Sequence, residues 1–174
     1  MLLKHFGYND KLFNVEKEYP LHTVCRKGHA DIFDILLSYG GNINEVIKTD
    51  FGNITPLSSA VAFNRIDIID RLLNIGLDIA SNHFIVLKCL YDCQSPEVLH
   101  RLFFHMNLNL LSKNGSNILS HYIYNRKSND LISATINLGV DVNNKDKNGM
   151  TPLIWSKRTQ NLFAFKALTK ANAL

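Results

Sequence analysis

The chain has 174 residues with a formal net charge of +4, and 46% of its residues are hydrophobic while 20% are charged. This composition is typical of chains that fold around an apolar core, and it argues against an intrinsically disordered protein. The positive charge forms no dense basic block, so a nucleic-acid partner is not expected.

The opening stretch, MLLKHFGYND, is too polar for a secretory signal. No later stretch approaches the roughly 18 apolar residues of a membrane span, so no membrane partner is expected. Leu2, Leu3 and Gly7 look like the end of a helical repeat whose other copies follow. Residues 1–13 are therefore either a half-repeat cap or the end of a repeat whose upstream sequence the chain has lost, and we predict a cap.

From residue 14 onward one pattern recurs. Its leading leucines are separated by 36, 30, 32 and 34 residues. They are Leu21, Leu57, Leu87, Leu119 and Leu153. In the first three copies an apolar pair begins 15 residues later, as in Leu36-Leu37 and Leu72-Leu73. This period predicts five repeats, at 14–49, 50–80, 81–111, 112–144 and 145–174.

Each repeat predicts two short helices. Thr55 and Thr151 are suited to cap the first helix, because a threonine hydroxyl accepts hydrogen bonds from free backbone N–H groups. Pro56 and Pro152 follow at the first helical position, where a missing N–H costs nothing. The apolar spacing between residues 66 and 75 predicts the second helix.

Glycines and asparagines mark where these helices end. Gly40 and Gly76 are expected to stop the second helix in the left-handed conformation. Repeat three lacks both the Thr-Pro start and this glycine. It still offers a buried stripe that includes Leu90, Leu102 and Phe103.

The words YPLHTVCRKGHADI, NITPLSSAV and GMTPLIW, set at this period, resemble the ankyrin repeat. The resemblance covers roughly residues 14–174; it is specific in repeats one, two and five, partial in four and weak in three. It implies an all-α solenoid of about five helix-turn-helix repeats with short β-hairpin loops, forming one domain over 1–174. Asn53 and Asn64 stand where the family has glycine, and asparagine tolerates the left-handed region well.

No constellation of residues indicates catalysis or a bound cofactor. Cys89 and Cys93 could share a helical face, but a zinc site needs two further ligands that the sequence does not offer. The family resemblance implies that His22 hydrogen-bonds across repeats. We therefore predict no enzyme, no cofactor and no metal site, with an enzyme or metal protein as the outside alternative. The three cysteines form no disulfide framework, which indicates a reducing, cytoplasmic location.

The resemblance also implies a protein-binding surface at the hairpin tips and the concave side of the first helices. The matching positions that we select are Arg26, Lys27, Phe51, Ile54, Phe63, Lys113, Tyr124, Arg126, Lys147, Met150 and Arg158. Phe51, Ile54 and Phe63 either form an exposed apolar patch or pack beneath the hairpin. The basic pairs at inter-helix turns either form a rim that attracts an acidic partner or are ordinary solvated charges.

These observations favour a non-catalytic protein-protein interaction module: an adaptor, an inhibitor or a host-directed effector. We expect a monomer that binds another protein in the cytoplasm, or in a host cytoplasm if it is an effector. The sequence is rich in Asn, Ile and Lys, and short ankyrin proteins that resemble it are common in viruses and intracellular bacteria. The alternative is a bacterial toxin-neutralising protein of the immunity type.

Overall fold

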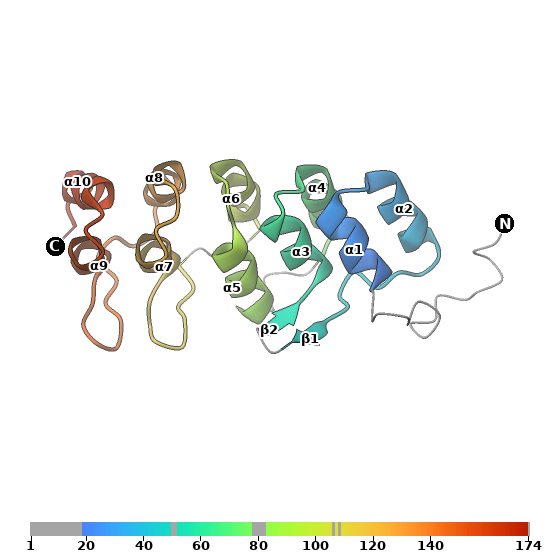
Figure 1. The fold of residues 1–174 in the computed structure, drawn as a ribbon, viewed down its shortest axis with the longest axis horizontal. Coiled ribbons are helices and arrows are strands. Elements are labelled where there is room, and N and C mark those ends of the chain that lie inside the picture. Colours follow the sequence, from blue (N-terminus) through green and yellow to red (C-terminus); the bar gives the residue numbers. More distant parts are fainter. Residues whose placement is uncertain (1–18, 50–51, 78–82, 106, 108, 174) are drawn as a thin grey trace. The chain divides into compact units, whose positions relative to one another are not determined.

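The computed structural model describes residues 19–49, 52–77, 83–105, 107 and 109–173. The chain divides into two compact units, Met1–Asp78 and Ile79–Leu174. Each unit is built from helix pairs, which Figure 1 shows in chain order. The predicted all-α repeat class is confirmed. Within the described ranges, none of the helices is both long and apolar enough to cross a membrane.

The described part of unit one contains two helix pairs and one hairpin. Its elements are α1 (Pro20–Lys27), α2 (Ala30–Ser38), β1 (Ile47–Thr49), β2 (Gly52–Ile54), α3 (Pro56–Ala62) and α4 (Ile66–Asn74). The strands are antiparallel, with Ile47 opposite Ile54 and Thr49 opposite Gly52. Helix α1 packs against α3, and α2 against α4. Leu21, Phe33 and Leu57 are fully buried between them.

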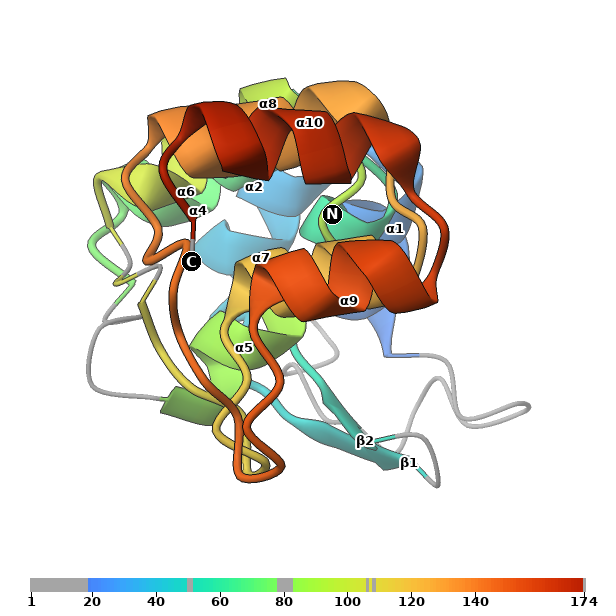
Figure 2. The ribbon, with the colours of Figure 1, turned by 90° about the vertical axis from the view of Figure 1, so that its left-hand side faces the viewer.

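Three helix pairs lie in the residues of unit two that the structure describes. Its helices are α5 (His83–Asp92), α6 (Pro96–Phe103), α7 (Ile118–Tyr124), α8 (Asn129–Asn137), α9 (Pro152–Arg158) and α10 (Leu162–Lys170). Helix α7 packs between α5 and α9, while α8 contacts both α6 and α10. Figure 2 shows α8 with α10 in one layer and α7 with α9 in the other. The loops that precede α7 and α9 extend side by side from the layer of first helices (Figures 1 and 2).

Side-chain caps fix where the first helices begin. Thr55 accepts a hydrogen bond from the Ser58 N–H, and the Ser58 hydroxyl accepts one from the Thr55 N–H, which completes a capping box. Thr151 caps α9 through the Ile154 N–H. A proline follows each threonine at the first helical position. The capping predictions for both threonines are confirmed.

Left-handed residues end the helices, as predicted at three positions. The φ angle is +87° at Gly40, +83° at Gly76 and +55° at Asn64. Asn53 differs from the family pattern: it is extended in β2, opposite Lys48. The chain reverses between β1 and β2 instead, so position 53 requires no left-handed conformation.

One helix pair falls within each predicted repeat range, including the weak third repeat. In that repeat Leu90 and Leu102 are buried, as expected. Phe103 was expected in the same stripe but is 36% exposed and meets the ring of Phe104 edge to face. The exact repeat boundaries, and the cap at 1–13, which lies outside the described residues, stay predictions.

Candidate functional site

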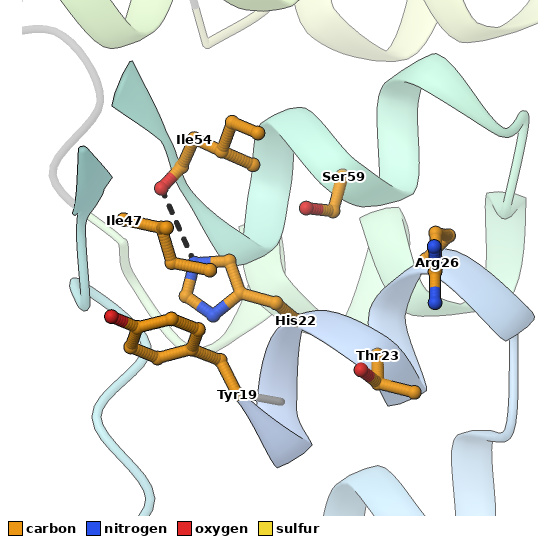
Figure 3. A pocket seen from close by; sticks show the side chains of 7 residues that line it. All are labelled: Tyr19, His22, Thr23, Arg26, Ile47, Ile54 and Ser59. Carbon is orange, nitrogen blue, oxygen red and sulfur yellow. Dashed lines mark hydrogen bonds between the residues drawn. The ribbon is translucent and has the colours of Figure 1, made fainter. Parts of the chain in front are cut away.

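Unit one has a pocket beside the start of α1. It has a volume of about 220 Å³. Figure 3 shows the seven side chains that line it: Tyr19, His22, Thr23, Arg26, Ile47, Ile54 and Ser59. They come from α1 with its N-cap, the two strands and α3. The predicted residues Arg26 and Ile54 therefore meet in one hollow.

His22 holds the wall of this pocket together. Its Nε2 lies 3.2 Å from the carbonyl oxygen of Ile54, 32 residues away in the next repeat (Figure 3). Burial lowers the pKa of His22, although backbone hydrogen bonds to Ile54 and Glu45 oppose that shift. We therefore assign a neutral ring that donates from Nε2, so the 3.4 Å approach of Nδ1 to the Glu45 carboxylate is not an ion pair at neutral pH. The expected hydrogen bond across repeats is confirmed.

Unit two has a larger pocket, which we call the aromatic pocket. Its volume is about 400 Å³. It lies beside helices α5, α7 and α9 and the loops that precede α7 and α9. Its described lining residues are Tyr91, Ser112, Asn114, Ser116, Ser120, His121, Tyr124, Asp146, Asn148 and Trp155.

Two pairs of rings form its walls. Tyr91 stacks on His121, with centroids 4.0 Å apart and planes 14° apart. Tyr124 meets Trp155 edge to face at 5.1 Å. Tyr124 is 58% exposed. An aromatic ring with one free face is a common anchor point for a binding partner, since it offers a large contact area at little cost in conformational entropy.

Hydrogen bonds within and between the two loops form the floor of the aromatic pocket. The Lys147 N–H donates to the Asn114 carbonyl at 2.9 Å, which ties one loop to the other. Asp146 Oδ1 accepts from the N–H groups of Asn148 and Met150 at 2.8 and 2.9 Å. Its Oδ2 lies 3.5 Å from the Ser116 hydroxyl, a long contact. These hydrogen bonds hold the two loops in place, and the Oδ2 atom of Asp146 can still accept a further hydrogen bond.

His121 carries no charge in the aromatic pocket at neutral pH. Burial lowers the pKa of His121 to about 4, and the nearby cation Lys127 contributes to the same shift. The ring therefore acts as a flat, neutral surface against Tyr91.

The other predicted surface residues of unit one lie as follows. Lys27 is exposed at the end of α1. Phe63 ends α3 and is 52% exposed. Phe51 lies outside the described residues. Ile54 is half-buried, so only part of the proposed apolar patch is available on the described surface.

In unit two, the prediction that Met150 lies on the surface is wrong. Met150 is buried, because its N–H and carbonyl both bond to Asp146 and hold the loop closed over it. Tyr124 lines the aromatic pocket, and Lys113 and Lys147 are exposed in the two neighbouring loops. Arg158 is exposed, with its guanidinium 5.9 Å from the centre of the Trp155 ring.

Basic residues at the inter-helix turns join adjacent repeats. Arg126 donates to the Thr159 carbonyl at 3.2 Å, and Lys127 donates to the Cys93 carbonyl at 3.2 Å. In unit one, Arg65 donates to the Arg26 carbonyl at 2.8 Å. Some of the charge that we predicted as a partner-facing rim therefore also holds the stack together. The rim itself stays a prediction.

The thiols do not form a reactive site. Cys25, Cys89 and Cys93 are buried, and none of them forms a disulfide bond. Burial raises the pKa of Cys25 to about 12 and also raises that of Cys93. Thiols with such pKa values are protonated and poorly nucleophilic at neutral pH. Among the described residues, no three His, Cys, Asp or Glu side chains gather as metal ligands would.

Sequence reasoning missed most of the aromatic pocket, although a signal for it exists. The positions two and five residues after the leading leucine are Thr23 and Arg26 in repeat one, and His121 and Tyr124 in repeat four. Trp155 is the first of these positions in repeat five. Residues three apart share a helical face, and all five line a pocket.

Comparison with known proteins agrees with this architecture. A family model described as ankyrin repeats (3 copies) matches residues 1–83. The mouse protein "Ankyrin repeat and SOCS box protein 11" is 29% identical over 103 residues, which is 58% of this chain and 31% of the relative. The protein of the same name from Pongo abelii is 28% identical over 92 residues, or 52% of this chain and 28% of the relative.

The chain thus spans about a third of the length of these curated relatives. The matched family model, the relatives and the recurring capped helix pairs agree with one another. Together they show that residues 1–83 match ankyrin repeats and that the chain is similar to ankyrin-repeat proteins.

Proposed function

We propose that this chain is a non-catalytic module that binds a segment of another protein in the aromatic pocket of unit two. Ankyrin repeats are generally protein-protein interaction modules, and the family is generally non-catalytic. The observation that carries the proposal is the pairing of exposed Tyr124 with Trp155 in a hollow of about 400 Å³. That volume lies within the range of pockets that hold a ligand group.

The surroundings of the pocket support a protein partner. Exposed Lys113 and Lys147 lie in the two loops that border it, where they would attract acidic groups on the partner and speed its association. In unit one, exposed Arg26 and Lys27 beside the smaller pocket offer a second, weaker contact area. An adaptor, an inhibitor and a host-directed effector would each use such a surface in the same physical way.

Selection of displayed peptides against the intact chain tests this proposal. The chain contains a single tryptophan, Trp155, so binding at the aromatic pocket can be followed by its fluorescence. We expect selected peptides to bind at least tenfold more weakly to Tyr124→Ala. The matched control is Leu162→Ala, because Leu162 is also exposed, at 64%, but does not line the pocket.

Peptides that bind wild type and Tyr124→Ala equally well, or that fail to alter Trp155 emission, would place the binding surface elsewhere. Loss of binding in Leu162→Ala to the same degree would show a general effect on the fold rather than a specific one.

A further inference from the structure

The aromatic pocket contains a buried polar atom, the hydroxyl oxygen of Ser120, that forms no hydrogen bond with the described part of the protein. Ser120 is 2% exposed and lines the pocket. Its N–H donates to the capping side chain of Asn117, but within the described part of the chain its hydroxyl oxygen has no hydrogen-bond partner. Buried polar groups are nearly always satisfied in folded proteins, so an unsatisfied hydroxyl that lines a pocket points to a group supplied from outside.

A second acceptor lies in the same pocket. Asp146 is 8% exposed, and only its Oδ1 is fully engaged, by two loop N–H groups. Its Oδ2 has the long contact of 3.5 Å with the Ser116 hydroxyl. Asp146 is the only charged side chain among the described residues that line the pocket. The described lining of the pocket therefore carries one negative charge, in a chain whose net charge is +4, while Lys113 and Lys147 are exposed in the loops around it.

The walls favour a flat cation. Tyr124 and Trp155 both line the pocket, and the faces of such rings attract guanidinium groups. The protein already places one guanidinium, that of Arg158, 5.9 Å from the centre of the Trp155 ring. A guanidinium also brings five N–H donors, which suits a pocket where Asp146 Oδ2 and the Ser120 hydroxyl can accept.

We propose that the aromatic pocket receives an arginine side chain from the partner protein, with its guanidinium between the Tyr124–Trp155 pair and the acceptors Asp146 and Ser120. This proposal rests on the proposed function, because it names the group that the partner presents at that surface. The acidic groups expected to meet Lys113 and Lys147 would flank this arginine, so the partner segment is mixed in charge.

The test is a titration of the ¹⁵N-labelled full chain with N-acetyl-arginine methylamide, followed by NMR. The matched probe is the citrulline analogue, which has nearly the same shape without the charge. We expect the arginine probe to shift the Trp155 indole signal and the amides of Ser120 and Tyr124, in a saturable way that weakens with added salt. The citrulline probe is expected to bind at least tenfold more weakly.

Two variants locate the interaction. Asp146→Asn keeps an oxygen to accept from the loop N–H groups while it removes the charge, and it is expected to weaken arginine binding at least fivefold. Tyr124→Ala is expected to do the same. A spectrum of each variant that matches wild type away from the pocket shows that the fold is intact.

Equal binding of arginine and citrulline probes, equal binding of N-acetyl-lysine methylamide, or no shift at Trp155 and Ser120 up to the solubility limit would each overturn the arginine proposal. The proposed function and the arginine proposal can be refuted independently of each other. Displayed peptides without arginine that bind in a Tyr124-dependent way would support that function while they contradict the arginine pocket.

Discussion

The edge of one ring in the Tyr124–Trp155 pair meets the face of the other with centroids 5.1 Å apart, and this contact joins the first helices of repeats four and five. Edge-to-face pairs contribute about 0.5–1.5 kcal/mol beyond their buried area. Since Tyr124 is more than half exposed, little further burial is lost when it is truncated. We expect Tyr124→Ala to lower the free energy of unfolding of unit two by about 1 kcal/mol.

Urea unfolding followed by Trp155 fluorescence measures this effect in unit two. Leu162→Ala serves as the comparison, because it removes an exposed side chain that has no ring contact with Trp155. A loss in Tyr124→Ala no larger than in that comparison would show that the ring pair contributes no specific stability.

We expect substitution of the capping residue Asn117 to lower the free energy of unfolding more than substitution of the capping residues Thr55 or Thr151. Its Oδ1 accepts from the Ser120 N–H, while its Nδ2 donates to the Asp141 carbonyl at 2.6 Å in the following loop. Asn117→Thr keeps the capping oxygen but leaves the carbonyl without this donor. We expect a loss of about 0.5–1.5 kcal/mol in the free energy of unfolding, the range for one lost hydrogen bond, because Asp141 is exposed and water can reach its carbonyl.

Asn117→Ala should cost about 1 kcal/mol more than Asn117→Thr, because it also removes the cap. Chemical denaturation of the two variants side by side is the measurement. If threonine and asparagine gave equal stability at position 117, the amide would have no role beyond capping.

The ends of the helices were predicted well from the sequence, because capping and termination depend on a few neighbouring residues. Thr55-Pro56 and Thr151-Pro152 start helices wherever they occur, and Gly40 and Gly76 end them. Met150 and Asn53 were less predictable. Their environments depend on how the Asp146 carboxylate closes one loop and on where the β1–β2 strands pair.

The candidate pocket was harder to predict than the fold for the same reason. Tyr124 was selected from its position, but Trp155 and Tyr91 become its neighbours only when helices from three repeats pack together. Nothing in the sequence indicated that Ser120 belongs to a binding site. A serine at this position becomes notable only in the structure, where its hydroxyl is buried and has no hydrogen-bond partner among the described residues.

Gln160 occupies a turn position that is better suited to glycine. Its φ angle is +55°, and the corresponding turn of repeat one uses Gly28 at +83°. A non-glycine residue in the left-handed region costs roughly 1–2 kcal/mol, and the greater entropy of an unfolded glycine offsets about half of that. We expect Gln160→Gly to raise the free energy of unfolding by about 0.5–1 kcal/mol.

Gln160→Ala is the control for loss of the side chain and should leave stability nearly unchanged. The reverse kind of substitution, Gly139→Ala, places a Cβ at φ +80° and should destabilise unit two by about 0.5–1 kcal/mol, since the same entropy difference offsets part of the strain. Thermal and urea unfolding of all three variants would refute this account if Gln160→Gly were less stable than Gln160→Ala.

Acid should weaken unit two through His121. The folded state lowers the pKa of this imidazole from 6.5 to about 4, mainly by burial against its neighbours. Because the unfolded chain binds a proton that the folded chain rejects, the contribution of His121 is fully present above pH 6.5 and is lost as the pH falls towards 4. Among the described residues, the groups recorded against the ring are Tyr91, Tyr122, Asn125 and Lys127, and none of these is a carboxylate that would stabilise the imidazolium.

The variant His121→Phe tests this expectation, since phenylalanine retains a ring to stack on Tyr91 but cannot titrate. Carboxylates elsewhere in the chain also titrate at low pH, so the informative quantity is the difference in unfolding free energy between wild type and variant. That difference should shift in favour of the variant between pH 7 and pH 4.5, roughly the window between the two pKa values. A difference that stays constant with pH, or an NMR titration of His121 with a midpoint near 6.5 in the folded chain, would show that the ring is solvated and that the packing of Tyr91 over it is loose.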